Sequence, residues 1–291
     1  MGIGLDYYLG EPKRFHPLVG FGSAAQAVEK KFNKHTYVSG LLVWLLMALP
    51  CVVVAFVIGG NVVVDSLLIY LAIGRKSLVQ HAQAIMKPLL NNDTAAARIQ
   101  LQKIVSRDVA HLDNTGIAKA SVESVLENAS DSTFAALFWY LVAGAPGVVL
   151  YRVANTLDAM WGYRSERFTK FGYVSAKVDD ILNYIPARLV AFSYALLGNY
   201  DKALSCWRSQ APLCDSPNAG PVMAAGAGAL SISLGGSYRH ANKPYQKPAL
   251  GIGKAACAAD IKRAITLMNN TLLLWLGVIV VLGAAIALGG N

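Results

Sequence analysis

The chain has 291 residues, of which 55% are hydrophobic and only 15% are charged, and its mean hydropathy is +0.42. An average soluble domain carries about 25% charged residues, so this composition favours a membrane protein over a soluble one. The net charge of +9 comes without any basic run interleaved with aromatic residues, which disfavours nucleic acid as a partner.

The first third of the chain predicts a membrane hairpin. Residues 1–40 form a polar entry segment without the apolar stretch of a secretory signal. The run 40–60 is almost wholly apolar and long enough to cross about 30 Å of hydrocarbon as a helix, and the shorter run 61–74 follows it. No Lys or Arg lies between Gly40 and Gly74, whereas both flanks are basic, so residues 41–74 form a hairpin with cytoplasmic flanks.

The middle of the chain mixes apolar runs with ionisable groups. Residues 75–131 predict amphipathic helices on the cytoplasmic side. The apolar run 134–153 contains Gly144-Ala145-Pro146-Gly147, and the run 181–197 contains Pro186 and Arg188. Broken helices at membrane depth are tolerated only where protein covers them or where they line a wet cavity. Residues 132–200 therefore form either a partly buried polar core or two ordinary kinked spans.

The last third predicts loops and then a final span. Residues 211–254 are rich in Gly, Pro and Asn, which favours loops around a run of small residues. Residues 271–290 contain no charged side chain and follow a basic segment, so this span carries the C-terminus outward. The expected fold is an all-α polytopic membrane protein, one domain over residues 1–291, with broken or re-entrant helices around a polar cavity.

Two acidic clusters are candidates for chemistry. Glu123, Glu127 and Asp131 share one helical face at spacings of four residues, where their repulsion calls for a divalent metal or an outside Arg. Asp179 and Asp180 stand at the mouth of an apolar run, where unligated carboxylates are costly. Both clusters suit Mg²⁺ beside phosphate oxygens. The alternatives are a solvated acidic face for the first cluster and an acid-rich helix N-terminus for the second.

Other polar groups carry weaker signals. Arg152, Asn155 and Asp158 follow an apolar run, and snorkelling or helix capping would also account for them. The loop 216–220 could turn backbone N–H groups towards an anion, although plain turn chemistry explains it equally. The sequence has no Walker A loop, GxSxG elbow, HExxH or GxGxxG motif, so any ATP site is not a P-loop.

Four blocks of the sequence together resemble the adenosylcobinamide-phosphate synthase family, the CbiB/CobD proteins of cobalamin biosynthesis. The blocks are Leu5-Asp6 with Gly10-Glu11-Pro12 and His16-Pro17; Arg107-Asp108 through Glu127-Asn128 and Asp131; Asn155-Thr156-Leu157-Asp158 with Gly162-Tyr163, Phe171-Gly172, Asp179-Asp180 and Asn183 to Arg188; and Ser216 to Gly220 with Gly235-Gly236. They follow one another along most of the chain. The sequence departs from the usual pattern at some positions, such as Lys177, where the family usually has Arg.

The resemblance implies a multi-pass enzyme of the bacterial cytoplasmic membrane. It would join an aminoalcohol phosphate to the free carboxylate of adenosylcobyric acid, with ATP as co-substrate and Mg²⁺ as cofactor. Membrane lipid and other cobalamin-assembly enzymes are the further partners that it implies. The candidate metal ligands and catalytic residues are Glu127, Asp131, Asp179 and Asp180. The candidates for binding substrates and phosphates are Arg107, Asp108, Asn128, Asn155, Asp158, Lys177, Asn183, Arg188 and Asn218.

Two other functions are compatible with the same features. An intramembrane prenyltransferase also uses acidic clusters to hold Mg²⁺ and diphosphate, although the sequence has fewer clean spans than that fold needs. A non-catalytic membrane sensor that kept the scaffold is the second alternative. The many ionisable groups retained near lipid disfavour it, because a sensor would not need them.

Overall fold

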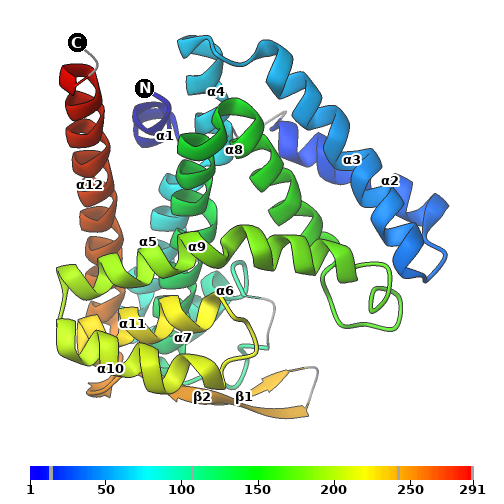
Figure 1. Ribbon diagram of the computed structural model, residues 1–291. Coiled ribbons are helices and arrows are strands. Elements are labelled where there is room, and N and C mark those ends of the chain that lie inside the picture. The colour runs from blue at the N-terminus through cyan, green and yellow to red at the C-terminus, as the bar shows by residue number, and fades with distance from the viewer. Residues whose placement is uncertain (13–15, 106–107, 241–242, 290–291) are drawn as a thin grey trace. The chain divides into compact units, whose positions relative to one another are not determined.

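A computed structural model describes residues 1–12, 16–105, 108–240 and 243–289, which are predominantly helical (Figure 1). The α-helices are α1 (Gly2–Leu9), α2 (Pro17–Phe32), α3 (Tyr37–Ile58), α4 (Val62–Ala72), α5 (Arg75–Leu90), α6 (Thr94–Leu101), α7 (Asn114–Ala129), α8 (Ala135–Trp161), α9 (Tyr173–Leu197), α10 (Tyr200–Gln210), α11 (Ala219–Leu230) and α12 (Ala258–Gly289). A π-helix, η1 (Ser130–Phe134), joins α7 to α8, and a 3₁₀ turn, η2 (Ala211–Leu213), follows α10.

The chain divides into two compact units, each built from two separate stretches of sequence. Unit 1 comprises Met1–Ser77 and Asp131–Pro186, and unit 2 comprises Leu78–Ser130 and Ala187–Asn291. The sequence predicted one domain over residues 1–291. All three boundaries between the units, which lie in α5, η1 and α9, interrupt helical segments rather than linkers, so composition gives no sign of them.

The residues of the predicted membrane hairpin, 41–74, lie in α3 and α4 of unit 1, and each of these helices packs against α8. The Thr36 hydroxyl caps α3 by accepting a hydrogen bond from the Ser39 N–H. At the turn, Asp65 accepts hydrogen bonds from the Gly60 N–H at 3.1 Å and from the Tyr140 hydroxyl at 3.0 Å. The carboxylate inside the second apolar run therefore fastens the hairpin to α8.

Helix α8 contains the break that the sequence predicted. The backbone leaves helical geometry at Ala143 and Gly144, and Gly144 has a φ of +60°, a conformation that side chains disfavour. Pro146 follows, where it cannot donate a backbone hydrogen bond. A Cβ on Gly147 would lie 2.2 Å from the carbonyl oxygen of Trp139, so the bent chain needs glycine there.

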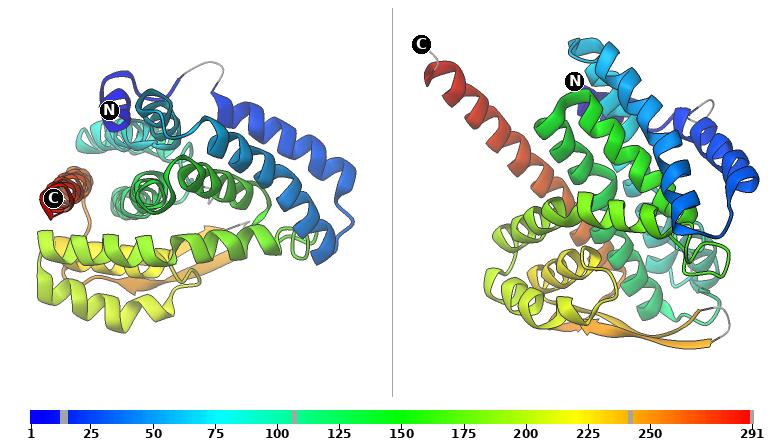
Figure 2. Two further views of the ribbon diagram at one scale, coloured as in Figure 1. Left: turned by 45° about the horizontal axis from the view of Figure 1, so that its top comes forward. Right: turned by 45° about the vertical axis from the view of Figure 1, so that its right-hand side comes forward.

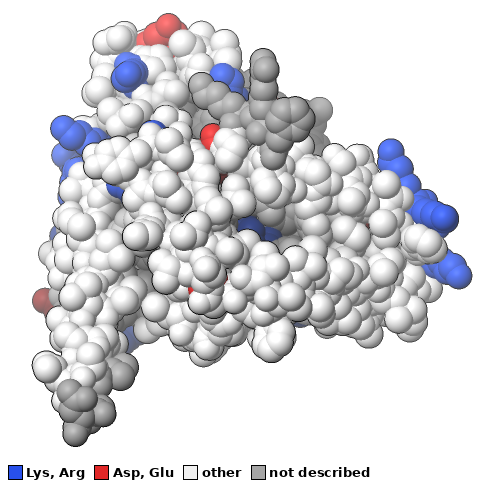
Figure 3. Space-filling model, turned by 90° about the horizontal axis from the view of Figure 1, so that it is seen from above, with Lys and Arg blue, Asp and Glu red and all other residues white. Residues whose placement is uncertain are grey.

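Within the described residues, three helical segments are long and apolar enough to cross a membrane: Tyr37–Ile58, Asn114–Trp161 and Ala258–Ala285. They confirm an all-α membrane protein and include the predicted first and last spans. The runs 61–74 and 181–197 lie in α4, which has only 11 residues, and in α9, and neither helix meets those criteria. Figure 3 shows that uncharged atoms predominate on the surface seen from above and are interrupted by small groups of Lys and Arg.

Unit 2 is built around α7, which packs against α11, α12 and strand β1. The sequence predicted amphipathic helices on the cytoplasmic side here, but every residue from Ile117 to Leu126 except Lys119 is buried, including Ser121 and Glu123. Helices α10 and α11 form a close pair, in which a Cβ on Gly228 would lie 2.6 Å from the carbonyl oxygen of Lys202. Small residues in α11 therefore serve close helix packing.

A small sheet occupies part of the segment for which the sequence predicted loops. Strands β1 (Ile232–His240) and β2 (Lys243–Leu250) are antiparallel, and β3 (Lys254–Ala255) runs parallel to β1, giving the order β2-β1-β3. Gly235 and Gly236 have positive φ, and the register shifts beside them. The glycines that indicated loops instead form an irregularity within a strand.

Helix α12 is the predicted C-terminal span. Asp260 in its first turn accepts hydrogen bonds from the Cys257 N–H at 2.9 Å and from the Arg263 guanidinium at 2.6 Å. Its C-terminal half projects beyond the other elements of unit 2 (Figure 2), and Leu273, Val280 and Val281 are exposed there. An exposed apolar helix surface of this kind is expected to face lipid.

Candidate functional site

A buried hydrogen-bond network in unit 1 surrounds Asp179. The side-chain amide of Asn155 donates to Asp179 Oδ1 at 3.2 Å, and that of Asn183 donates to Oδ2 at 3.0 Å. The hydroxyl of Tyr151 lies 2.9 Å from Asn183 Oδ1 and 2.7 Å from the carbonyl oxygen of Asp131. The break in α8 and the turn after it bring α8 and α9 together, and their polar residues meet at one carboxylate.

Burial raises the pKa of Asp179 from 3.8 to about 6, and the charge of Asp180 adds to this effect. The amides of Asn155 and Asn183 oppose it, because they donate to the ionised form. Asp179 therefore remains ionised at neutral pH while holding a proton more readily than an exposed aspartate. A carboxylate of this kind can accept a proton during catalysis near neutral pH.

Two further carboxylates lie beside this network. Asp158 interacts electrostatically with both Asp179 and Asp180. A Cβ on Gly162 would lie 2.0 Å from Asp158 Oδ1, so glycine is needed for the turn that closes over this carboxylate. Asp180 pairs with Lys177 across 3.6 Å at the helix surface. Unit 1 thus brings together the candidate residues Asn155, Asp158, Asp179 and Asn183, with Lys177 and Asp180 at the edge.

In unit 2, Glu123 forms an ion pair with Lys247 of β2. The sequence predicted a divalent metal or an Arg beside this acidic cluster. Lys247 Nζ lies 3.0 Å from Glu123 Oε2, and the Gly235 N–H donates to Oε1 at 2.9 Å. The Glu123 side chain is 4% exposed and that of Lys247 is 26% exposed. The pair holds the β1–β2 hairpin on α7.

Glu127 lies one turn further along α7 and lines a small cavity of about 140 Å³. Asp215, Ser216 and Lys247 line the same cavity. The Ser216 hydroxyl accepts hydrogen bonds from the N–H groups of Asn218 at 3.3 Å and Ala219 at 3.1 Å. The hydroxyl thus caps the start of α11, so the turn chemistry proposed for this loop is present beside an acidic side chain.

Arg188 binds the same loop through both arms of its guanidinium. Nη1 donates to Asn218 Oδ1 at 3.1 Å and Nη2 donates to the Pro217 carbonyl oxygen at 3.1 Å. This fixes the planar fork of the guanidinium. Arg188 also lines a hollow of about 800 Å³, together with Trp207 and Arg208. The predicted phosphate-binding residues Arg188 and Asn218 are therefore in direct contact.

The remaining predicted residues have local contacts. Asn128 donates to the carbonyl oxygen and the hydroxyl of Ser124 on its own helix, at 2.8 and 3.0 Å. Asp108 accepts a hydrogen bond from the Ala110 N–H at 2.9 Å and lies 4.0 Å from His111 Nε2. Arg107 lies outside the described residues. These contacts account for Asn128 and Asp108 structurally and assign them no ligand.

The predicted metal ligands divide between the units, with Glu127 in unit 2 and Asp131, Asp179 and Asp180 in unit 1. In the described parts of the chain, no group of three or more His, Cys, Asp or Glu side chains is arranged to hold a metal ion. Magnesium in proteins commonly takes one or two carboxylates and completes its shell with water and substrate phosphates. The carboxylates of unit 1 fit a metal that arrives with phosphates.

Sequence reasoning missed two residues of these networks, Tyr151 and Lys247. Tyr151 lies within an apolar run, where an aromatic residue reads as lipid-facing or core. Its hydroxyl nevertheless links Asp131 to Asn183. Lys247 stands in a segment that predicted loops, and only its pairing in β2 brings it to α7. The available signal was the uncompensated charge of Glu123, which required a cation from elsewhere.

Comparison with known proteins identifies relatives along nearly the whole chain. The family described as CobD/Cbib protein matches residues 1–268. The cobalamin biosynthesis protein CobD of Stutzerimonas stutzeri is 51% identical over 280 residues, which cover 94% of this chain and 92% of the relative. The protein of the same name from Chromobacterium violaceum is 48% identical, with 98% and 95% covered, and that of Mycobacterium tuberculosis H37Rv is 37% identical, with 92% and 89% covered. No solved structure matches.

Proposed function

Because the chain belongs to the CobD/Cbib protein family and its relatives support a role in cobalamin biosynthesis, we propose that it forms adenosylcobinamide phosphate. The proposed substrates are adenosylcobyric acid and (R)-1-aminopropan-2-ol phosphate or a close aminoalcohol phosphate. The reaction is an amide ligation driven by ATP. The names of the relatives support the pathway, and the polar groups of unit 1 support the reaction.

The reaction needs an activated carboxyl group, because a free carboxylate would have to expel oxide. Transfer of the γ-phosphoryl group of ATP to a carboxylate oxygen gives an acyl phosphate and ADP. The amine of the aminoalcohol phosphate then attacks the acyl carbon, loses a proton and displaces inorganic phosphate as the C–N bond forms. Such phosphoryl transfer depends mainly on positioning and on charge neutralisation.

Asp179 is the best candidate for the base that takes the proton from the amine. Its two amide donors fix both carboxylate oxygens, and its pKa of about 6 suits proton transfer near neutral pH. The guanidinium of Arg188, held by Asn218 and Pro217, is a positioned planar cation of the kind that binds phosphate oxygens. Asp131, Asp180 and Glu127 are the candidates for holding Mg²⁺, which when bound would neutralise phosphate charge.

The observation that carries this proposal is the buried network at Asp179. A carboxylate that accepts from two asparagines, one of which accepts in turn from a tyrosine, is costly to bury with two more carboxylates beside it. If these residues only packed α8 against α9, apolar side chains would stabilise the contact at least as well. Such a cluster is the kind of site expected to bind cationic or phosphorylated reactants.

The test is turnover by the purified protein in detergent. Adenosylcobyric acid, aminopropanol phosphate and Mg-ATP should give adenosylcobinamide phosphate and ADP, identified by mass spectrometry of the corrinoid. Replacing ATP with its non-hydrolysable β,γ-imido analogue should prevent product formation, and Asp180→Asn should abolish it while leaving membrane insertion intact. No corrinoid product from the wild type, or release of diphosphate from a prenyl diphosphate instead, would exclude the proposed reaction. Near-normal turnover by Asp180→Asn would remove that residue from the catalytic set.

A further inference from the structure

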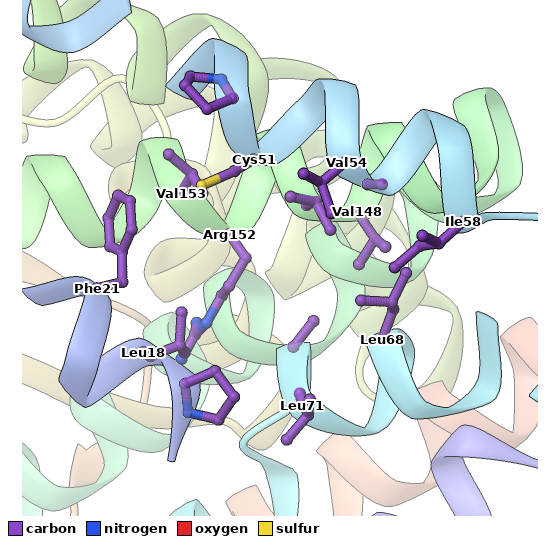
Figure 4. A pocket seen from close by; sticks show the side chains of 15 residues that line it. Leu18, Phe21, Cys51, Val54, Ile58, Leu68, Leu71, Val148, Arg152 and Val153 are labelled. Atoms are coloured by element: carbon purple, nitrogen blue, oxygen red, sulfur yellow. The ribbon is translucent and has the colours of Figure 1, made fainter. Parts of the chain in front are cut away.

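An apolar cavity in unit 1 is lined by none of the residues that hold Asp179. It has a volume of about 430 Å³ and is lined by side chains of α2, α3, α4 and α8. Phe21, Val54, Leu68 and Val148 represent the four helices in Figure 4. Ligand cavities of this size are usual for small molecules, and an apolar cavity gains nothing from water.

One charged side chain, Arg152 of α8, lines this cavity. Figure 4 shows it reaching from α8 towards Leu18, with its nitrogen atoms beside the first turn of α2. Its Nη1 donates to Asn155 Oδ1 at 3.3 Å, but its Nε is inaccessible to solvent and has no hydrogen-bond partner among the described residues. A charged donor left unsatisfied in an apolar setting is costly, so this group calls for an acceptor.

The surroundings of the guanidinium define the acceptor. The N-terminus of α2 carries a partial positive charge, and its residues Pro17 and Leu18 line the cavity beside Arg152. The carboxylates of Glu11 and Asp131 also interact with the guanidinium, although neither is hydrogen-bonded to Nε. A ligand at this end must therefore bring an oxyanion that makes a direct hydrogen bond, and its remainder must be apolar.

We propose that this cavity binds an anionic phospholipid, with one acyl chain between α2, α3, α4 and α8 and a phosphate oxygen at Arg152. Helix α3 is a candidate membrane span, and Leu46, Leu49 and Val53 on it are exposed. Bilayer lipid is therefore the most abundant apolar molecule at this surface. A phosphodiester is a charge-assisted acceptor that matches guanidinium geometry. The site does not depend on the reaction proposed above.

The experiment measures lipid bound to the full chain after purification. The protein is incubated in detergent with equal amounts of phosphatidylglycerol and phosphatidylcholine, washed, and analysed by native mass spectrometry. We expect about one phosphatidylglycerol per chain, enriched about tenfold over phosphatidylcholine, since one charge-assisted hydrogen bond contributes about that factor. Arg152→Gln should abolish the enrichment. Val148→Phe, which fills the cavity without changing charge, should reduce retention of both lipids.

Arg164→Gln is the matched control, because it removes an exposed arginine of the same unit. It should retain lipid as the wild type does. Equal retention by wild type and Arg152→Gln, or no preference for the anionic headgroup in the wild type, would overturn the proposal. Occupation by detergent alone would do the same. If Arg152→Gln cannot be purified, the headgroup preference of the wild type and the effect of Val148→Phe still decide the outcome.

Discussion

Replacing Asp179 by asparagine should stabilise the protein above pH 6 and at the same time end turnover. The carboxyl pKa is 3.8 in an exposed setting and about 6 here, with burial as the main cause. That difference corresponds to about 3 kcal/mol against the ionised native carboxylate. Asparagine carries no charge, but its amide group cannot accept from both neighbouring amides, so one hydrogen bond worth about 1 kcal/mol is lost. The net gain is about 2 kcal/mol.

The pH dependence follows from the direction of this pKa. Below 3.8 both the folded and the unfolded chain hold the proton, so Asp179 contributes no difference. Between 3.8 and about 6 the unfolded chain releases the proton first, and stability falls as pH rises. Above that range the full cost applies. Relative to wild type, Asp179→Asn should thus gain nothing near pH 4 and should gain most above pH 7.

Thermal unfolding of both proteins in the same detergent at several pH values measures this gain. About 2 kcal/mol corresponds to a Tm higher by about 3 °C for a protein of this size. Glu166→Gln is the control, because it removes an exposed carboxylate of the same unit, where charge contributes little to stability. A Tm gain for Asp179→Asn that is the same at pH 5 and pH 8, or a loss at both, would refute the assignment of a buried, ionised carboxylate.

Three further predictions concern the other charged contacts. Lys247→Met should destabilise the protein by about 2 kcal/mol because it leaves Glu123 buried without its cation, and adding Glu123→Gln should restore most of the lost Tm. Arg167→Gln should lower Tm at pH 7. Glu29 is buried, which raises its pKa, yet its hydrogen bonds to Arg167 and Asn33 hold that pKa below the ordinary 4.5, so the loss should vanish as pH falls below that range. Arg188→Lys should raise the KM for the aminoalcohol phosphate about tenfold in steady-state assays with little change in kcat, because lysine keeps the charge but lacks the planar, two-armed guanidinium. An unchanged KM would give Arg188 a structural role only.

The membrane elements could be predicted because their signals are local. An uncharged run of helical length predicts α3 and α12, and Gly144 with Pro146 predicts the break in α8. The polar residues of unit 1 were also visible, because Asn155, Asp179 and Asn183 stand next to apolar runs where they are costly. In each case the deciding information lies within about twenty residues.

The pairing in unit 2 could not be predicted from such local signals. Glu123 and Lys247 are separated by 124 positions and meet because β1 and β2 pair beside α7. The glycines at 235 and 236 make β1 hard to predict, because glycine is typical both of loops and of strand irregularities. The burial of α7 was missed for a related reason, because Ser121 and Glu123 are polar in sequence and become core residues only through partners elsewhere.

The buried carboxylates of unit 1 and unit 2 have partners of different charge. In unit 2 the buried acid Glu123 pairs with the cation Lys247 and accepts a hydrogen bond from a backbone N–H. These contacts attach the β1–β2 hairpin to α7, which is a structural role. In unit 1, the hydrogen bonds that Asp179 accepts from described residues come from the neutral amides of Asn155 and Asn183, and the further acids Asp158 and Asp180 lie near it. Neutral donors orient a carboxylate without cancelling its charge, which leaves it able to attract a metal ion or accept a proton. This difference is the physical reason to seek the reaction at Asp179 and to treat Glu123 as structural.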